Sequence, residues 1–148
     1  MSSTDGSRIP GLDQAPYIGA LLRLGLQMAR DRIAQALNDR GLGDINQAYA
    51  PLFQYPPIDG MRPSDLAKRL AISKQALNHI LGQVEKLGYI ERRTEGRGAA
   101  VYFTERGWLV LETIVATMQQ LEAAWQAQIG KRRFSELKTT LKELTGET

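Results

Sequence analysis

The stretch Pro63-Ser-Asp-Leu-Ala-Lys-Arg-Leu-Ala-Ile-Ser73-Lys-Gln-Ala-Leu-Asn-His-Ile-Leu-Gly-Gln-Val-Glu-Lys-Leu-Gly88 decides the fold. Proline is tolerated at the first position of a helix, and apolar residues follow Pro63 at helical spacing. Ala71 and Ile72 then form a turn. Ser73 suits the N-cap of a second helix, whose apolar residues recur at steps of three and four until Gly88 ends it. The pattern predicts two helices joined by a tight turn.

The second helix has a polar face opposite its apolar stripe. Successive residues turn by about 100°, so the polar side chains of its first half share one outward face. Side chains at this end of a helix can hydrogen-bond to base edges in a major groove. A solvated amphipathic helix would show the same pattern, so this face alone does not show that the helix reads DNA. The residues predicted to contact DNA from this helix are Ser73, Lys74, Gln75, Asn78, His79 and Lys86.

A short hairpin is predicted directly after the second helix. Tyr89-Ile-Glu-Arg-Arg93 and Ala99-Ala-Val-Tyr-Phe103 are typical of strands, and the two glycines between them permit a tight turn with Arg97 at its tip. Two helices followed by an arginine-tipped hairpin form the winged helix-turn-helix pattern. We therefore expect Arg97 to enter a minor groove, and Arg92 and Arg93 to meet phosphates.

From Leu66 to Gly107 the chain resembles the MarR family of bacterial transcriptional regulators. The wing is shorter than the family's usual wing. Other winged-helix families, such as PadR-like and ArsR-like regulators, share the core pattern, but the long flanking helices favour MarR. The resemblance implies a regulator that binds double-stranded DNA as a dimer, with Arg97 as the wing arginine. The matching residues are Leu66-Ala67, Leu70, Ser73, Leu81, Val84-Glu85, Gly88, Ile90, Arg92 and Phe103-Thr104-Glu-Arg-Gly107.

Long amphipathic helices are predicted at both ends of the chain. One of about 25 residues follows Thr104, a fair N-cap, and stops at Gly130; it is longer than a small winged domain can cover. Another starts near Ile18. Packing within a monomer remains an alternative, but an intertwined two-fold homodimer uses these faces most economically, and the resemblance implies it. The predicted interface comprises Leu21, Leu22, Leu111, Ile114, Met118, Leu121, Trp125 and Phe134.

The sequence thus predicts a mainly α protein with a small β-hairpin wing. Residues 1–13 are expected to be a flexible segment and 14–43 the N-terminal dimerisation helix. Residues 44–104 would form the winged helix-turn-helix DNA-binding domain, and 105–148 the C-terminal dimerisation helices. The 148 residues, of which 43% are hydrophobic, suffice for such a core.

Charge and absent residue types narrow the function further. Met61 to Arg106 holds nine Lys or Arg against five Asp or Glu, which leaves the rest of the chain, whose total net charge is +3, at about −1; the positive charge lies where DNA would bind. There is no cysteine and only one histidine, so we expect no metal site, and no catalytic or nucleotide-binding motif is present, so we expect no enzyme and no cofactor. No apolar run is long enough for a membrane span or a signal peptide, which predicts a cytoplasmic protein without membrane partners.

Several aromatic residues lie between the first long helix and the helix-turn-helix, or begin neighbouring helices. In MarR-like proteins the crevice between the dimer lobe and the DNA lobe takes small aromatic effectors, so these side chains are candidates for such a pocket. Aromatic residues more often serve the core. The candidate pocket residues are Tyr17, Tyr49, Phe53, Tyr55 and Trp108.

Two function classes remain open from the sequence. The first is a dimeric, sequence-specific DNA-binding regulator, a repressor that a small aromatic effector would release. The second is a winged-helix protein-protein interaction module without specific DNA binding, which the short wing and the modest net charge permit. The steep salt dependence of phosphate contacts separates the two classes.

Overall fold

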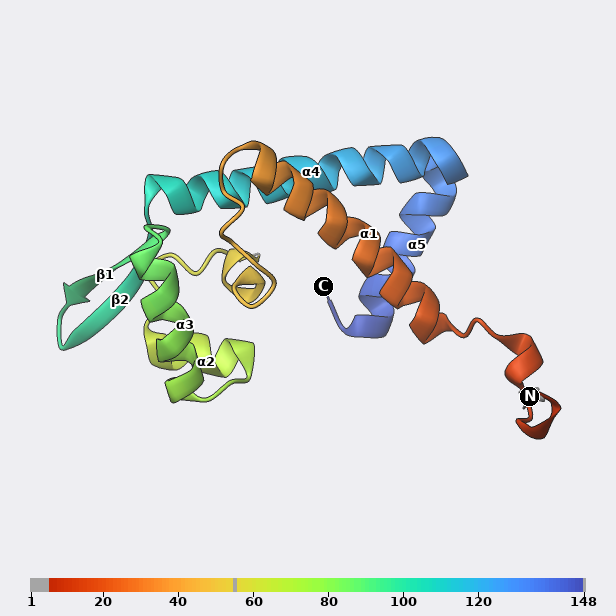
Figure 1. Cartoon of the computed structure of the whole chain (residues 1–148), viewed down its shortest axis with the longest axis horizontal. Coiled ribbons are helices and arrows are strands. Elements are labelled where there is room, and N and C mark those ends of the chain that lie inside the picture. Colours follow the sequence, from red (N-terminus) through yellow and green to blue (C-terminus); the bar gives the residue numbers. More distant parts are fainter. Residues whose placement is uncertain (1–5, 55, 148) are drawn as a thin grey trace, which may run out of the picture.

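The computed structural model describes residues 6–54 and 56–147 of the chain, which form helices and one β-hairpin (Figure 1). The described part of the predicted flexible segment contains two short 3-10 turns, Gly6–Arg8 and Leu12–Gln14. The predicted mainly α fold with a small hairpin is confirmed. In chain order the remaining elements are α1 (Ile18–Asp39), a 3-10 turn η3 (Ala50–Phe53), α2 (Pro63–Leu70), α3 (Lys74–Lys86), β1 (Ile90–Glu95), β2 (Gly98–Phe103), α4 (Glu105–Ile129) and α5 (Lys131–Thr145).

The helix-turn-helix forms where the sequence predicts it. Helix α2 runs from Pro63 to Leu70 and is followed by its C-cap Ala71, which adopts a left-handed φ of 54°. The amide of Ile72 then donates to the carbonyl of Ala67 at 3.1 Å, which satisfies an otherwise free carbonyl at the end of α2. The Ser73 hydroxyl accepts a hydrogen bond from the Ala76 amide at 3.0 Å. Ser73 is therefore the N-cap of α3, as predicted.

The hairpin is longer than predicted. The strands were expected over 89–93 and 99–103, but they pair antiparallel from Ile90 with Phe103 to Glu95 with Gly98. Only Gly96 and Arg97 remain in the turn, and Gly96 has a left-handed φ of 60°. The prediction stopped the first strand two residues too early and began the second one residue too late, because it assigned Glu95 and Gly98 to the turn, whereas a two-residue hairpin turn lets the ladder run to its tip.

One core joins α3, the hairpin and the start of α4. Leu77, Leu81 and Val84 of α3 are completely buried, and so is Val110 of α4. Gly107 allows this close packing, because a Cβ at that position would lie 2.1 Å from the carbonyl oxygen of Tyr89. The core therefore crosses the domain boundary predicted between residues 104 and 105. Helix α4 begins inside the winged-helix lobe and continues out of it as one rod.

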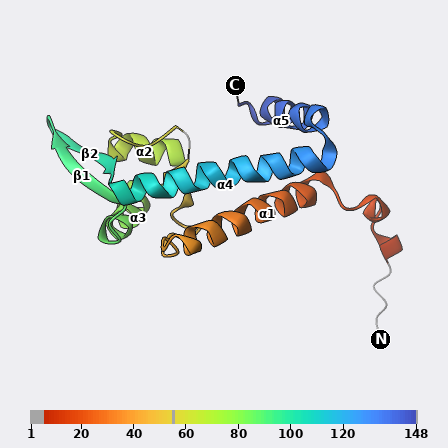
Figure 2. The same cartoon turned by 90° about the horizontal axis from the view of Figure 1, so that it is seen from above.

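The termini of α4 follow the predicted capping residues. The Gly107 amide donates to the Thr104 hydroxyl at 3.2 Å at the start, and Gly130 ends the helix with a φ of 94°. Helix α1 lies along α4, and α5 folds back from the end of α4 (Figure 2). Among the described residues, none of the helices is long and apolar enough to cross a membrane.

The predicted dimer residues occupy different environments within one chain. Leu121 and Phe134 are only 3% and 6% exposed, so both are already covered within one chain. The Trp125 ring meets the Phe134 ring edge-to-face, with centroids 6.5 Å apart. Leu21 and Leu22 of α1, by contrast, are each 47% exposed. The remaining three, Leu111, Ile114 and Met118, are half-buried.

Candidate nucleic-acid interface

The outer face of α3 is free of the core. Its inner face is fully occupied, since the three apolar residues Leu77, Leu81 and Val84 have no exposed surface. Gly82 lies on the outer side of α3, where a Cβ would meet nothing within 4 Å. All six predicted DNA-contacting residues of this region are exposed: Ser73, Lys74, Gln75, Asn78, His79 and Lys86.

A small hollow of about 120 Å³ lies between the beginnings of α2 and α3. Lys74 and Asn78, both predicted to contact DNA, contribute to its lining. Ser64 of α2 lines it too, and sequence reasoning missed this residue. The available signal was its place in the first turn of α2, because the first helix of a helix-turn-helix crosses the DNA backbone.

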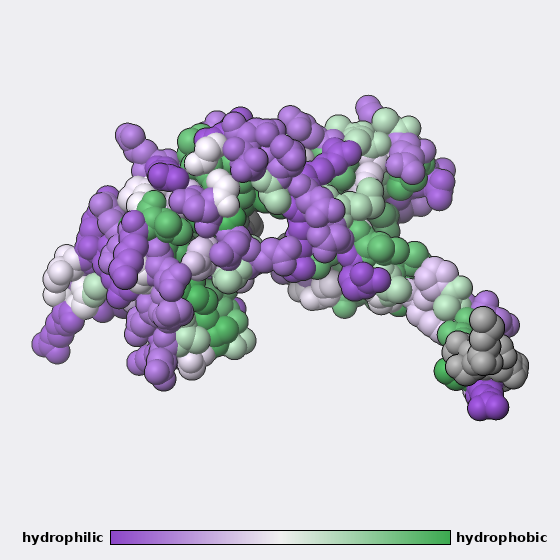
Figure 3. Space-filling view, in the orientation of Figure 1, coloured by the Kyte–Doolittle hydropathy of each residue, from purple (hydrophilic) through white to green (hydrophobic). Residues whose placement is uncertain are grey.

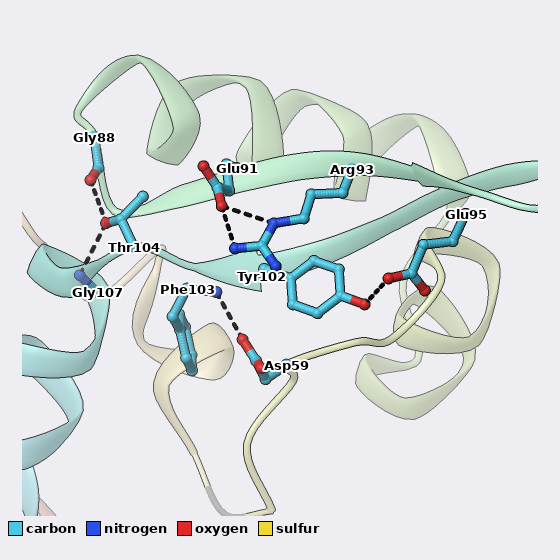
Figure 4. Close-up of polar contacts among 9 residues, drawn as sticks. All are labelled: Asp59, Gly88, Glu91, Arg93, Glu95, Tyr102, Phe103, Thr104 and Gly107. Atoms are coloured by element: carbon cyan, nitrogen blue, oxygen red, sulfur yellow. Dashed lines mark hydrogen bonds and ion pairs between the residues drawn. The ribbon is translucent and has the colours of Figure 1, made fainter.

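One face of the wing carries a charged cluster (Figure 4). Arg93 donates from Nε and Nη2 to Oε1 of Glu91 at 2.8 and 2.5 Å, and its guanidinium lies 4.3 Å from the centre of the Tyr102 ring. The Tyr102 hydroxyl donates to Glu95. The bond to Glu91 raises the pKa of Arg93, and the bond to Glu95 raises the pKa of Tyr102. Arg93, predicted to meet phosphates, is therefore already engaged within the wing.

The other wing arginines differ in their partners. Arg92 forms an ion pair with Glu85 of α3, with Nε and Oε2 3.6 Å apart. Arg97 is exposed at the tip and has no ion pair with any residue that the structure describes. Arg62 lies against the base of the turn, where its Nη1 is 2.8 Å from the place a Cβ of Gly98 would take. No local pattern pointed to Arg62, because this contact joins residues 36 positions apart.

Hydrogen bonds fix the wing to the neighbouring elements (Figure 4). The Phe103 amide of β2 donates to Oδ1 of Asp59 at 2.9 Å. The Thr104 hydroxyl donates to the carbonyl oxygen of Gly88 at 2.6 Å. Gly88 has a φ of 86°, which favours glycine at the end of α3. The wing, α3 and α4 therefore keep a fixed relative orientation.

A buried tyrosine anchors this junction from the other side. Tyr89, with no exposed surface, donates its hydroxyl hydrogen bond to Asp44, and Arg106 donates to the same hydroxyl at 3.0 Å. The Arg106 guanidinium lies 4.6 Å from the centre of the Tyr89 ring and forms an ion pair with Asp44 at 3.3 Å. Burial, with a smaller contribution from the bond to Asp44, raises the pKa of Tyr89. This cluster links the loop after α1 to the starts of β1 and α4.

The candidate pocket residues are not all brought together within one chain. Phe53 is buried and stacks on Phe103, with centroids 5.4 Å apart. Trp108, 42% exposed, meets Phe103 edge-to-face at 5.0 Å. Tyr17 lies away from them, at the far end of α1, where its hydroxyl donates to the Gly11 carbonyl.

Two further candidates have separate outcomes. Tyr49 is half-buried, and its hydroxyl donates to Gln83 of α3. Tyr55 lies outside the described residues. Among the members of the predicted set that the structure describes, only Phe53 and Trp108 share an aromatic cluster, and Phe53 serves the core.

Hydrophobic patches occur on both parts of the surface. Figure 3 shows hydrophilic side chains over much of α3, with hydrophobic patches both beside α2 and along the helices at the other end of the molecule. The exposed apolar side chains of the helical end are Ile18, Leu21, Leu22, Leu24, Leu26 and Met28 on α1, Val115 on α4, and Leu137 and Leu144 on α5.

The chain matches no protein-family model, and no curated protein matches it. Solved structures do resemble it. A MarR transcriptional regulator from Methanosarcina mazei Go1 superposes over 87% of each chain with a TM-score of 0.68 and 18% identity. The Mycobacterium tuberculosis MarR family protein Rv2887, in complex with DNA, covers 88% of this chain and 98% of its own, with a TM-score of 0.61 and 22% identity. The chain has the MarR fold.

The MarR fold extends beyond the stretch that predicted it. The S. aureus protein MepR bound to ethidium bromide covers 88% of this chain and 95% of its own, with a TM-score of 0.61 and 18% identity. Matches of this extent include the long terminal helices as well as the winged-helix lobe. The resemblance drawn from residues 66 to 107 is thereby confirmed as a likeness of fold.

Proposed function

We propose that this chain is a sequence-specific transcriptional regulator that binds double-stranded DNA through α3 and the wing. One observation carries the proposal. The first half of α3 exposes Gln75, Asn78 and His79 while the opposite face of the helix is completely buried. Side chains of these types read base edges in a major groove. The fold it shares with Rv2887, which was solved in complex with DNA, supports the same function.

Free cations beside this face support phosphate contacts. Lys74 and Lys86 are the first and last residues of α3, and Arg97 lies at the wing tip; no ion pair holds any of the three among the described residues. Phosphate contacts release counterions, so each should make binding weaker as salt rises. Arg92 contributes less in this proposal, because Glu85 already partners it.

We further propose that the protein acts as a homodimer. Six apolar side chains of α1 and two of α5 are exposed within one chain, and a concentration of exposed apolar side chains is typical of an interaction surface. A two-fold dimer would place two α3 helices on successive half-sites of a palindrome. Leu21, Leu22 and Leu137, which are 47%, 47% and 43% exposed, are candidate side chains for this contact.

A repressor released by a small aromatic effector completes the proposal. Trp108 leaves much of its ring exposed beside Phe103, where α4 leaves the winged-helix lobe. An aromatic ligand stacked there would press on the joint that sets the angle of α3 and the wing. MepR, which shares the fold, was solved with the planar aromatic ethidium.

A fluorescence-anisotropy titration on DNA flanking the coding region tests DNA binding. Tight binding to one fragment that weakens steeply between low and high salt supports the proposal, and binding with no preference over random DNA contradicts it. Sedimentation of Leu22→Glu, compared with the wild type, tests the dimer. Leu22 is the better site than Leu121, because Leu121 is buried within its own chain and a charge there would also unfold the monomer.

A protein-protein interaction module remains the second candidate function. The observation favouring it is that Glu91 and Glu95 lie on the same wing face as Arg93, so this face presents negative charge that DNA would repel. An interaction module should bind no DNA fragment at any salt concentration. The same titration therefore separates the two functions.

A further inference from the structure

A hydrogen-bonded relay leads from the loop after α1 to the DNA-facing side of α3. The Tyr49 hydroxyl donates to Oε1 of Gln83 at 2.7 Å. Nε2 of Gln83 lies 3.3 Å from Nε2 of His79, one helical turn earlier on α3. His79 is the only histidine of the chain and one of the exposed residues on the proposed reading face. The proposed DNA contacts alone assign no role to these two hydrogen bonds.

The donors and acceptors fix where the imidazole proton lies. Once Oε1 of Gln83 accepts from Tyr49, the amide group of Gln83 offers only N–H donors to His79. Nε2 of a neutral His79 must then accept, so its ring proton lies on Nδ1. Among the described residues no hydrogen bond engages Nδ1. Nδ1–H is therefore the group left for a ligand.

Tyr49 is well placed to keep the side-chain amide of Gln83 in this orientation. Its ring packs partly buried against the core, and its backbone carbonyl accepts from the Leu52 amide at 3.0 Å. The buried Leu52 and Phe53 anchor the same 3-10 turn. The hydroxyl is thus presented to α3 from a fixed support, whereas Gln83 and His79 are exposed side chains that could otherwise rotate.

We propose that Tyr49 and Gln83 are positioning residues that make His79 present an Nδ1–H donor to DNA. The inference rests on the proposed DNA-binding function and deepens it by naming a base preference. A donor in the major groove matches N7 or O6 of guanine, N7 of adenine or O4 of thymine. It does not match the exocyclic amino groups of cytosine or adenine. The relay would therefore make His79 favour a hydrogen-bond acceptor at its position in the site.

A single substitution should reverse the donor. In Gln83→Glu the carboxylate can only accept, so it draws the imidazole proton to Nε2 and leaves Nδ1 as an acceptor. In Tyr49→Phe the amide of Gln83 loses the bond that orients it, and both tautomers should be populated. In Gln83→Met neither partner remains. Tyr17→Phe is the matched control, because it removes a tyrosine hydroxyl at the far end of α1.

Nitrogen-15 NMR of the His79 ring in the free protein tests the relay without DNA. At about pH 8.5, above the range in which an imidazole ordinarily gains its second proton, the wild type and Tyr17→Phe should show the Nδ1–H form. Gln83→Glu should show the Nε2–H form, and Tyr49→Phe and Gln83→Met a mixture. An Nε2–H form in the wild type, or the same spectrum in wild type and Gln83→Met, would overturn the proposal. Amide spectra of each variant confirm that it is folded.

Selection of DNA sequences by the wild type and by Gln83→Glu then tests the base preference. At one position the wild type should prefer an acceptor by about threefold to tenfold, the value of one hydrogen bond, and Gln83→Glu should prefer an amino group there. The ratio between two sequences is insensitive to the charge that glutamate adds. If the wild type selects no sequence, the proposed function fails; if it selects one and His79→Ala and Gln83→Glu select the same one, only the relay fails.

Discussion

Helix α3 and the wing both present basic residues, but these residues differ in whether an ion pair already holds them. On α3, Lys74 and Lys86 are exposed and unpaired among the described residues. In the wing, Arg92 and Arg93 are paired with Glu85 and Glu91, and only Arg97 at the tip is free in the same sense. The number of basic residues therefore overstates the charge that the wing can offer to DNA. The wing is held by these ion pairs and offers one unpaired cation, Arg97, at its tip among the described residues.

The physical reason lies in the strand geometry. Side chains two residues apart on a strand share a face, so Glu91 and Arg93 meet on β1 and Tyr102 lies across from Glu91 on β2. On α3 the acidic Glu85 is one residue from Lys86 and faces the wing instead. Surface ion pairs are weak, typically worth about 1 kcal/mol or less. A phosphate could thus displace Glu91, but it would gain less from Arg93 than from Arg97.

The largest effect should come from the joint that holds the two regions together. Gly107→Ala places a methyl group 2.1 Å from the Tyr89 carbonyl oxygen, so α4 must move away from the start of β1. We expect a loss of about 3 kcal/mol in the free energy of unfolding, at the upper end of overpacking costs. Urea denaturation followed by circular dichroism measures it.

Gly82→Ala makes the same substitution in the open face of α3 and serves as the control. A Cβ there meets nothing within 4 Å, so helix propensity alone should decide. The variant should gain about 1 kcal/mol of stability. Equal stability changes in the two variants would show that α4 and β1 are not closely packed at Gly107.

The next effect concerns the bases. Gln75→Ala and Asn78→Ala each remove a side-chain amide from α3. Each should weaken the free energy of binding by about 1 to 3 kcal/mol on the preferred DNA sequence and by much less on random DNA. Fluorescence anisotropy on both fragments measures the difference. Gln35→Ala removes the same type of exposed side chain from α1, which is not part of the proposed interface, and should change the affinity for neither fragment. Losses of equal size on both fragments would mean that α3 does not specify sequence.

The wing arginines test the comparison directly. Arg97→Ala should weaken binding to all sequences alike and lower the salt slope by about one unit, as for the loss of one phosphate contact. Arg93→Ala should change the slope by much less, because its guanidinium is already bonded to Glu91 and stacked over Tyr102. Equal slopes for the two variants would show that pairing in the wing does not limit contact with DNA.

Local patterns carried most of what the sequence could predict. The caps at Ser73 and Thr104 and the length of α4 follow from residues within a few positions of each other, and the structure confirms them. The MarR fold was predicted from residues 66 to 107 together with the long helices on either side. Backbone propensity and periodicity act over such short spans, so one sequence contains enough information to place these elements.

What the sequence could not predict depends on contacts between distant residues. The Tyr49–Gln83 bond spans 34 positions, and Arg62 meets Gly98 only because α2 lies beside the wing. Leu121 was predicted for a dimer interface, yet the same apolar pattern also suits packing against α1, and the structure buries it within its own chain. Periodicity identifies an apolar face but not what covers it.

Freeing the paired arginine should give the smallest effect, and in the opposite direction. Glu91→Gln removes the carboxylate that holds Arg93, so the guanidinium becomes available to a phosphate. Affinity for all DNA sequences should rise modestly at low salt, and the salt slope should steepen by less than one unit, because an exposed pair is weak to begin with. Glu95→Gln is the matched control, since it removes the same charge from the same wing face but leaves Arg93 bonded to Glu91. Anisotropy titrations at several salt concentrations compare the two. If both variants gain affinity equally, the effect is the overall charge of the wing; if Glu91→Gln gains more, the pairing of Arg93 is what distinguishes the wing from α3.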